Sequence, residues 1–277
     1  MTSWPVKQKL YLFWTLAVLI LLVAVFAPFL TPFDPNAQDL SLSLQAPSFS
    51  HLLGTDGYGR DLLSRIIAGA RTSVLATLSL VTLIALTGTF MGALCGYVGG
   101  KTDVALMRLS DVFLAFPGLV FALAVASVLG GGVLNAVLAL AVISWPKYAR
   151  LVRGQVLVQK EQEYVKAARL DGAGSLRILV LFILPNVANT ILITAFLDFG
   201  TMLMEIAGLS FLGLGAQPPT AEWGAMMSGG RSLIQTSPWT VLAPGGAIFL
   251  TVGIFNLLGD TMRDYLDPHK DKQESLN

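Results

Sequence analysis

The sequence predicts an all-α integral membrane protein with six transmembrane helices. The 277-residue chain is 54% hydrophobic and 13% charged, with a mean hydropathy of +0.69. Soluble domains carry about 25% charged residues. Six apolar stretches have the length that a helix needs to cross a bilayer, and they cover residues 11–30, 74–97, 106–129, 133–152, 178–206 and 241–260.

The basic residues predict the orientation of these spans. Cytoplasmic segments of membrane proteins are enriched in Lys and Arg. With six spans, only four of the 18 basic residues fall on one side, namely Arg60, Arg65, Arg71 and Arg231. The remaining 14 fall on the other side, seven of them around the segment between spans four and five. We therefore expect this segment and both chain termini in the cytoplasm.

The first span has a signal peptide as its alternative, because a basic start precedes it. Its length of about 20 residues and the lack of a small-residue cleavage site favour an uncleaved helix. A long polar loop follows. We divide the chain into residues 1–72, the first span with its external loop, and residues 73–277, the transmembrane domain, with a cytosolic loop at about 153–177.

Several function classes lack their motifs in this sequence. It contains no nucleotide-binding fingerprint and no zinc-type Cys/His cluster, its single cysteine is Cys95, and both histidines, His51 and His269, lie outside the spans. We expect a chain with no catalytic residue, no cofactor of its own and no nucleic-acid partner.

The most polar element within the apolar part of the chain covers residues 161–177. Glu163, Lys166 and Arg169 contribute to a charged helix face, whereas Ala167 and Ala168 belong to a face of small residues. Gly172 then allows the backbone to turn. We interpret this element as a docking helix for a partner outside the membrane. A helix lying at the lipid headgroups is the alternative, but the face lacks a stripe of leucine or large aromatic residues.

The motif Lys166-Ala-Ala-Arg-Leu-Asp-Gly172, followed by thirteen residues that end in Leu184-Pro185, resembles the "EAA" loop of permease subunits in bacterial ABC importers. Ala167, Ala168, Gly172, Leu184 and Pro185 match that pattern. Lys166 replaces the family's glutamate, and Glu163 supplies a carboxylate one turn earlier. Further signatures resemble the second permease subunit of the dipeptide/oligopeptide/nickel branch, and these are Leu53-Gly-Thr-Asp56, Phe211-Leu-Gly-Leu-Gly215, Glu222-Trp-Gly224 and Asn256-Leu-Leu-Gly-Asp260.

The resemblance implies a transmembrane permease in the bacterial inner membrane. Its partners would be two ABC ATP-binding subunits that hold ATP and Mg, a second, homologous permease subunit and an extracytoplasmic solute-binding protein. The ATPase-coupling residues would be Glu163, Lys166, Ala167, Ala168, Arg169, Gly172 and Pro185.

Two further groups are candidate sites. Asp198, Thr201, Met202 and Glu205 would form a polar line on span five, because residues seven apart project within about 20° of each other. We expect this line to face the substrate pathway, with hydrogen bonding between spans as the alternative. In the external segments, the candidate docking residues for a binding protein are Asp56, Arg60, Asp61, Glu222 and Trp223.

The pattern of span five looks closer to nickel permeases than to dipeptide permeases. Nickel or a metal chelate is therefore the expected cargo, with dipeptides or oligopeptides as the alternative. A secondary transporter is the more distant alternative, and it would carry internal repeats. An ion channel or an intramembrane enzyme would need a pore loop or a catalytic constellation, and we find neither in the sequence.

Overall fold

A computed structural model describes residues 5–266, so that His269 and the last residues of the chain lie outside it. All regular secondary structure in the described part is helical, and this part contains no strand. Short 3-10 turns cover Leu40–Leu42 and Arg231–Leu233, and a π-helical turn covers Leu179–Ile183. The α-helices are α1 (Val6–Leu30), α2 (Leu62–Val98), α3 (Gly100–Leu114), α4 (Gly118–Val128), α5 (Val133–Lys160), α6 (Glu163–Leu170), α7 (Ser175–Ile178), α8 (Leu184–Phe211), α9 (Trp223–Gly230) and α10 (Trp239–Leu266).

The all-helical prediction is confirmed, and the number of apolar spans is four or five. The helical stretches Val6–Leu30, Leu62–Val98, Ser175–Phe211 and Trp239–Leu266 are long and apolar enough to cross a membrane, and the bent pair α3–α4 makes the fifth. The fourth expected span, α5, is not among these candidates, and its apolar first half is followed by Lys147, Arg150 and Arg153 on the same helix. Six spans and cytoplasmic termini stay predictions.

The third expected span, residues 106–129, differs from a single helix. It consists of parts of α3 and α4, which are bent by 88° at the intervening break. Pro117 explains the break, because its ring removes a backbone N–H and disfavours helical geometry at Phe116. The fourth expected span also differs, since α5 continues to Lys160 and shortens the cytosolic loop.

Three glycines on α2, four residues apart, bring this helix into close contact with α5. A Cβ added at Gly88 would lie 2.4 Å from the Tyr148 Cβ, and one at Gly92 would lie 2.4 Å from the Ala149 carbonyl oxygen. At Gly96 it would lie 2.8 Å from the Val156 Cβ. Small residues at this spacing allow membrane helices to approach closely. The pair α2–α5 is therefore the packed centre of the fold.

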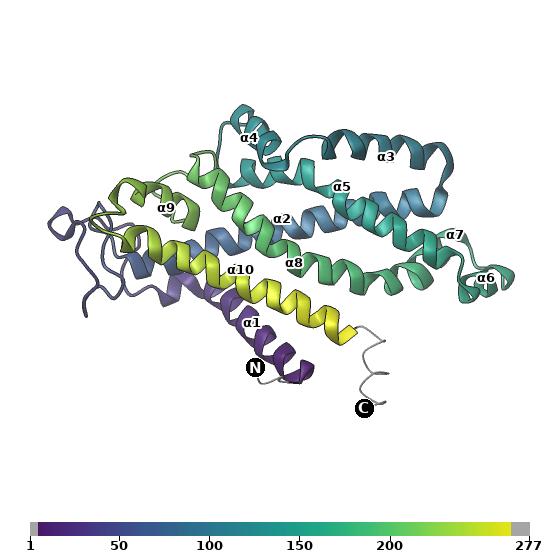
Figure 1. Cartoon of the computed structure of the whole chain (residues 1–277), viewed down its shortest axis with the longest axis horizontal. Helices are drawn as coiled ribbons and strands as arrows, with labels where there is room; N and C mark the ends of the chain where they lie inside the picture. Colours follow the sequence, from purple (N-terminus) through teal and green to yellow (C-terminus); the bar gives the residue numbers. More distant parts are fainter. Residues whose placement is uncertain (1–4, 267–277) are drawn as a thin grey trace.

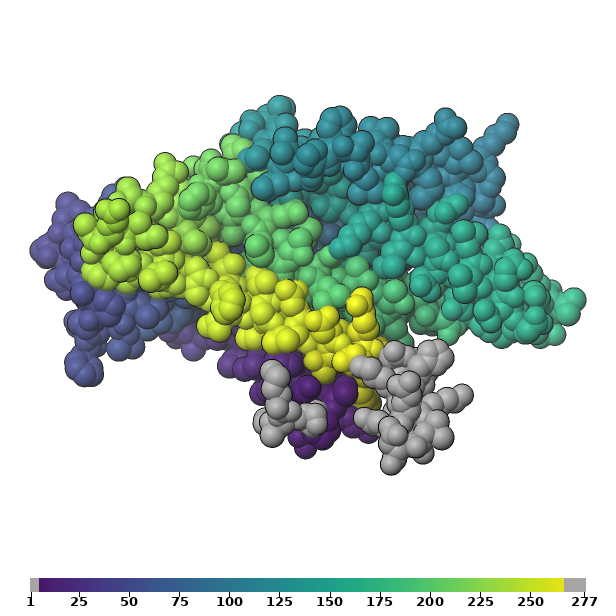
Figure 2. Space-filling model, in the orientation of Figure 1, coloured from purple at the N-terminus to yellow at the C-terminus, as the bar shows by residue number. Residues whose placement is uncertain are grey.

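The long helices α2, α5, α8 and α10 run lengthwise through the molecule (Figure 1). The helices α6 and α7 lie at one extremity, here named the α6 end. The helix α9 and the loop between α1 and α2 lie at the opposite extremity, here named the α9 end. On the surface, the segment around α6 forms a protruding lobe (Figure 2). Polar segments thus occupy both ends of an apolar bundle.

Candidate functional site

The helix α6 is attached to the bundle by one narrow face. Val165 and Ala168 are buried and join a small cluster that includes Val152 of α5 and Val187 of α8. The helix is followed by Gly172, whose φ of +80° is a conformation that favours glycine. The remaining residues of α6 are exposed. The sequence predicted this helix and its turn, and the structure places both at a free extremity.

The charged residues of α6 are exposed, as a docking helix requires. Lys166 Nζ donates to Glu163 Oε1 at 2.9 Å, and the two side chains are 48% and 90% exposed. The hydrogen bond to Glu163, together with its charge, raises the pKa of Lys166. Ala167 and Arg169 are exposed beside this pair. The five residues of α6 predicted for coupling therefore include four on the open side and Ala168 on the buried side.

Two leucines that the sequence reading missed extend the open surface of α6. Leu170 is 89% exposed and Leu176 is 75% exposed. Burial of apolar surface is the main favourable contribution to most protein–protein association, so an exposed leucine at this end is a candidate contact. The sequence shows that both leucines lie close to the Gly172 turn. It does not show which side of a helix will be exposed.

A hydrogen-bonded link connects α6 with α8. The Asn186 side chain donates to the Tyr164 hydroxyl at 3.3 Å and to the Phe182 carbonyl oxygen at 2.6 Å. Between the two helices lies the π-helical turn Leu179–Ile183, and Pro185 follows it near the start of α8. Single π-helical turns are frequent at functional sites. A displacement of α6 would therefore be passed to α8 through a short, irregular segment.

The polar line predicted on span five lies on α8, and its residues differ in burial. Asp198 and Met202 are buried, Glu205 is half-buried and Thr201 is exposed. The structure thus directs Asp198 and Met202 into the bundle. Their assignment to the substrate pathway stays a prediction.

Asp198 forms an ion pair with Lys147 of α5, a partner that the sequence reading did not identify. The Asp198 side chain is 3% exposed, whereas that of Lys147 is 58% exposed. Ionisable side chains inside a membrane protein usually pair with one another or face a wet cavity. The sequence feature that could have pointed to Lys147 as this partner is its position near the end of an apolar stretch.

Three of the five residues proposed for docking at the α9 end are buried and hold the loops in place. Asp61 caps α2, accepting from the Ser64 backbone N–H at 2.8 Å, and lies 2.9 Å from His51 Nδ1. Trp223 is 3% exposed and donates through Nε1 to the Ile66 carbonyl oxygen at 3.0 Å. Asp61 and Trp223 are thus buried in this conformation, and their part in docking a binding protein stays a prediction.

Glu222 is the most buried of the three, with no exposed surface. Its carboxylate accepts from the Ser73 hydroxyl at 3.0 Å and from the Ala225 backbone N–H at 2.8 Å, which ties α9 to α2. Burial raises the pKa of Glu222, and the hydrogen bonds to the carboxylate oppose this effect. The residue therefore acts on the fold of the α9 end and is closed to an external partner in this conformation.

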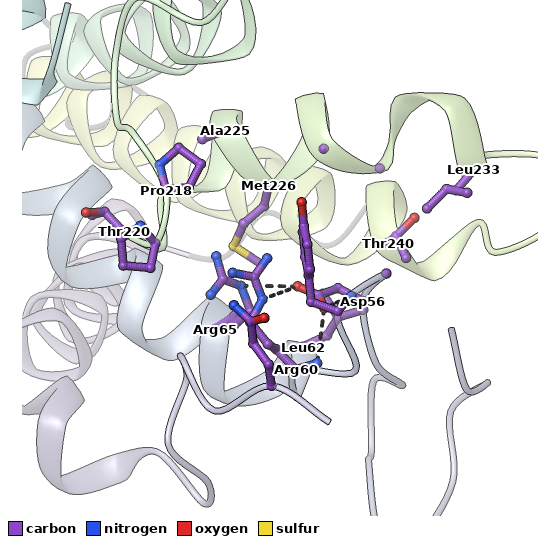
Figure 3. A pocket seen from close by; sticks show the side chains of 16 residues that line it. Asp56, Arg60, Leu62, Arg65, Pro218, Thr220, Ala225, Met226, Leu233 and Thr240 are labelled. Atoms are coloured by element: carbon purple, nitrogen blue, oxygen red, sulfur yellow. Dashed lines mark hydrogen bonds and ion pairs between the residues drawn. The ribbon is translucent and has the colours of Figure 1, made fainter. Parts of the chain in front are cut away.

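The other two proposed docking residues, Asp56 and Arg60, border a pocket at the α9 end (Figure 3). Arg60 Nε lies 2.7 Å from Asp56 Oδ2. Residues 56–61 form a loop that precedes α2. Asp56 and Arg60 are the residues of this group that an external molecule can reach.

Comparisons with known proteins identify a family of transport proteins. Residues 88–272 match the family model described as binding-protein-dependent transport system inner membrane component. Residues 13–47 match the N-terminal transmembrane domain of oligopeptide transport permease C. These matches decide against the secondary transporter, the channel and the intramembrane enzyme.

Curated relatives cover most of this chain. A probable D,D-dipeptide transport system permease of Escherichia coli K12 is 43% identical over 258 residues, which are 93% of this chain and 87% of that protein. The nickel transport system permease of the same strain is 40% identical over 97% of this chain and 95% of its own length. A glutathione transport system permease of Escherichia coli O6:K15:H31 is 45% identical over 91% and 83%. The named cargoes of these relatives differ.

Proposed function

The chain belongs to the family of binding-protein-dependent transport system inner membrane components, and from this premise we propose that it forms half of the translocation pathway of an ATP-driven importer of small peptides. It is an ABC-type transport permease of the inner membrane, and its family is not a catalytic one. In the proposed complex, a homologous permease forms the other half of the pathway, and two ATP-binding subunits hold ATP and Mg. A solute-binding protein delivers the cargo at the α9 end.

The observation that carries the coupling role is the open position of α6 at one extremity, with a hydrogen-bonded link to α8. We propose that α6 docks on an ATP-binding subunit and follows its closure. Tyr164, Asn186 and the π-helical turn pass this motion to α8. Since α8 carries Asp198, which pairs with Lys147 of α5, the motion reaches the contact between two long helices.

For the cargo, we favour small peptides over nickel. Relatives named for D,D-dipeptide, di/tripeptide, dipeptide and glutathione transport support this choice. The ion pair with Lys147 neutralises Asp198, so this carboxylate is a weak ligand for a metal cation. Nickel is the second candidate, because the nickel permease matches 97% of the chain and 95% of its own length. The pattern in α8 that favoured nickel does not separate the two cargoes by itself.

The coupling proposal is tested with Leu170→Asp in the purified transporter. We expect ATP hydrolysis stimulated by the loaded binding protein to fall by about tenfold, because an unpaired carboxylate would replace an apolar contact in the interface. The matched control is Leu52→Asp, which places the same charge on a 60%-exposed leucine near the α9 end. Unchanged stimulation in Leu170→Asp, with the complex intact, would contradict docking through α6.

The cargo is tested by uptake of labelled dialanine, nickel and a nickel chelate in cells that lack other uptake systems for these compounds. The complete set of subunits is expressed with this chain or with an empty vector. We expect chain-dependent uptake of dialanine. Uptake of nickel or its chelate without dialanine would replace the peptide by the metal.

A further inference from the structure

The pocket at the α9 end is large enough for a small molecule. It has a volume of about 350 Å³ and lies between the loop before α2, the start of α2 and the segment around α9 (Figure 3). Pockets for small ligands commonly have volumes of about 300–1,000 Å³. The site is thus assembled from parts of the chain that are far apart in sequence.

Two guanidinium groups of this pocket share a single carboxylate. Arg60 Nε lies 2.7 Å from Asp56 Oδ2, and Arg65 Nε lies 3.6 Å from the same oxygen. The other carboxylate oxygen of Asp56 accepts from the backbone N–H groups of Tyr58 and Arg60, at 2.8 and 3.1 Å. The Asp56 carboxylate is therefore held in place. Because it carries one negative charge and the two arginines carry two positive charges, these three residues have one positive charge in excess.

Both arginines are held in position by their surroundings. The Arg60 guanidinium carbon lies 4.7 Å from the centre of the Tyr58 ring, a cation–π contact. Arg65 is 4% exposed and donates through Nη1 to the Pro35 carbonyl oxygen at 2.8 Å. Within residues 5–266, neither Nη atom of Arg60 has a hydrogen-bond partner, and neither has Nη2 of Arg65. These donors are available to an anion.

The rest of the lining suits the carbon skeleton of an organic anion. Leu62 of α2, Met226 of α9 and Leu233 contribute apolar surface, and Gly229 and Gly230 leave room beside it. A buried charge is costly unless it is paired, so the excess positive charge favours a negatively charged ligand. Guanidinium groups bind carboxylates with paired hydrogen bonds. The combination indicates a small molecule that ends in a carboxylate.

We propose that the pocket formed by Arg60, Arg65 and α9 binds the C-terminal carboxylate of a short peptide at the α9 end of the permease. The identity of the ligand rests on the proposed peptide-import function. The free Nη atoms hold the carboxylate, and the side chain of the last residue lies against Leu62 and Met226. Under this proposal Arg60 contacts the cargo itself, in place of the binding-protein contact that the sequence predicted for it.

The experiment measures dialanine binding to the assembled transporter in lipid nanodiscs, without binding protein and without ATP. Dialanine is compared with its C-terminal amide, which lacks the negative charge. We expect the amide to bind at least about tenfold more weakly, and Arg60→Gln to weaken dialanine binding by a similar factor, since hydrogen bonds between charged groups are lost. Arg231→Gln is the control, because it removes an exposed arginine near α9 that is not part of the lining.

Arg60→Lys keeps the charge and loses the forked donors, and it covers the case in which Arg60→Gln does not assemble. We expect this variant to bind dialanine more weakly than the wild type while its binding stays sensitive to the amide. Equal binding of dialanine and its amide to the wild type would overturn the proposal. So would unchanged dialanine binding in both Arg60 variants, or a loss of affinity for the binding protein alone.

The uptake test described above separates the two proposals. If cells expressing the wild-type transporter import nickel and no dialanine, the proposed cargo is wrong, whatever the nanodiscs bind. If dialanine is imported but the Arg60 variants bind it as tightly as the wild type does, only the pocket assignment is wrong.

Discussion

The helices α6 and α9 have the same length and opposite surroundings. Each has eight residues and a glutamate at its N-terminal end, where a carboxylate interacts favourably with the helix dipole. Glu222 is fully buried and accepts hydrogen bonds that reach α2. The Glu163 side chain is 90% exposed and pairs with Lys166 of its own helix. The same local chemistry thus fastens one helix to the bundle and leaves the other free.

This difference separates the two ends of the molecule by what they can do. At the α9 end, buried polar groups hold the loops against the start of α2, so that a pocket keeps its shape. At the α6 end, a small apolar cluster holds one face of a helix and leaves the charged face and Leu170 for a partner. A rigid end suits recognition of a ligand, and a lightly attached end suits the transmission of motion.

We expect the largest loss of stability from a substitution in the contact between α2 and α5, because both ends of the molecule depend on this pair of helices. In Gly92→Ala, the new Cβ would lie 2.4 Å from the Ala149 carbonyl oxygen. We expect the free energy of unfolding to fall by about 2 kcal/mol or more, since overpacking forces helices apart. The measurement is the thermal unfolding midpoint of the purified transporter.

Gly154→Ala on α5 is the matched control, because nothing lies within 4 Å of the added Cβ. Alanine there should stabilise the helix by about 0.5–1 kcal/mol. Equal changes in stability for Gly92→Ala and Gly154→Ala would contradict the close contact between the α2 glycines and α5. The idea that this contact connects the two ends rigidly would then be wrong.

The second effect compares Glu222→Ala with Glu163→Ala. The loss of Glu222 leaves the buried Ser73 hydroxyl and the Ala225 N–H without an acceptor. Two orphaned groups at about 1–3 kcal/mol each would cost about 2–6 kcal/mol. Because the substitution also removes the cost of burying the carboxyl itself, we expect a destabilisation at the lower limit, of about 2 kcal/mol. Glu163→Ala removes a surface ion pair and should cost less than about 1 kcal/mol. Denaturant unfolding of both variants measures the contrast, and similar values would refute the assignment of different roles.

The third effect is a difference in pH dependence. Because burial raises the pKa of Glu222, the folded state binds this proton more tightly than the unfolded state. The associated stability is present below the unfolded pKa and is lost as pH rises through the folded pKa. We therefore expect the wild type to lose stability relative to Glu222→Gln as the pH rises from acidic to neutral. The measurement is the unfolding midpoint of both proteins across this pH range. A constant difference would show that Glu222 does not titrate between these limits.

The sequence predicted the features that depend on local pattern and composition. The apolar stretches gave the helices, and the residues from Glu163 to Gly172 gave α6 with its turn. Local pattern could not show that Glu222 and Trp223 are buried, because their partners Ser73 and Ile66 lie about 150 residues earlier in the chain. We therefore predicted the same docking role for the buried pair Glu222 and Trp223 as for the accessible pair Asp56 and Arg60.

Two further contacts show where sequence reasoning stops. The spacing of Gly88, Gly92 and Gly96 was a readable signal of close helix packing, but it does not identify α5 as the partner. The pairing of Asp198 with Lys147 joins residues on two helices, and no periodicity within either helix specifies it. In each case the missing information is the relative placement of elements, which tertiary packing determines.

The smallest effect on stability is expected for Glu163→Gln and Lys166→Gln, and it tests the freedom of α6 most directly. Each change breaks an exposed pair within one helix, so the denaturant unfolding midpoint should stay close to that of the wild type. ATP hydrolysis stimulated by the loaded binding protein should nevertheless fall severalfold in Glu163→Gln, because this carboxylate stands where a partner would meet α6. Stimulation is measured in nanodiscs and stability by denaturant unfolding. A loss of stability as large as that of Glu222→Ala would mean that the pair fastens α6 as Glu222 fastens α9. Normal stimulation would remove Glu163 from the coupling surface.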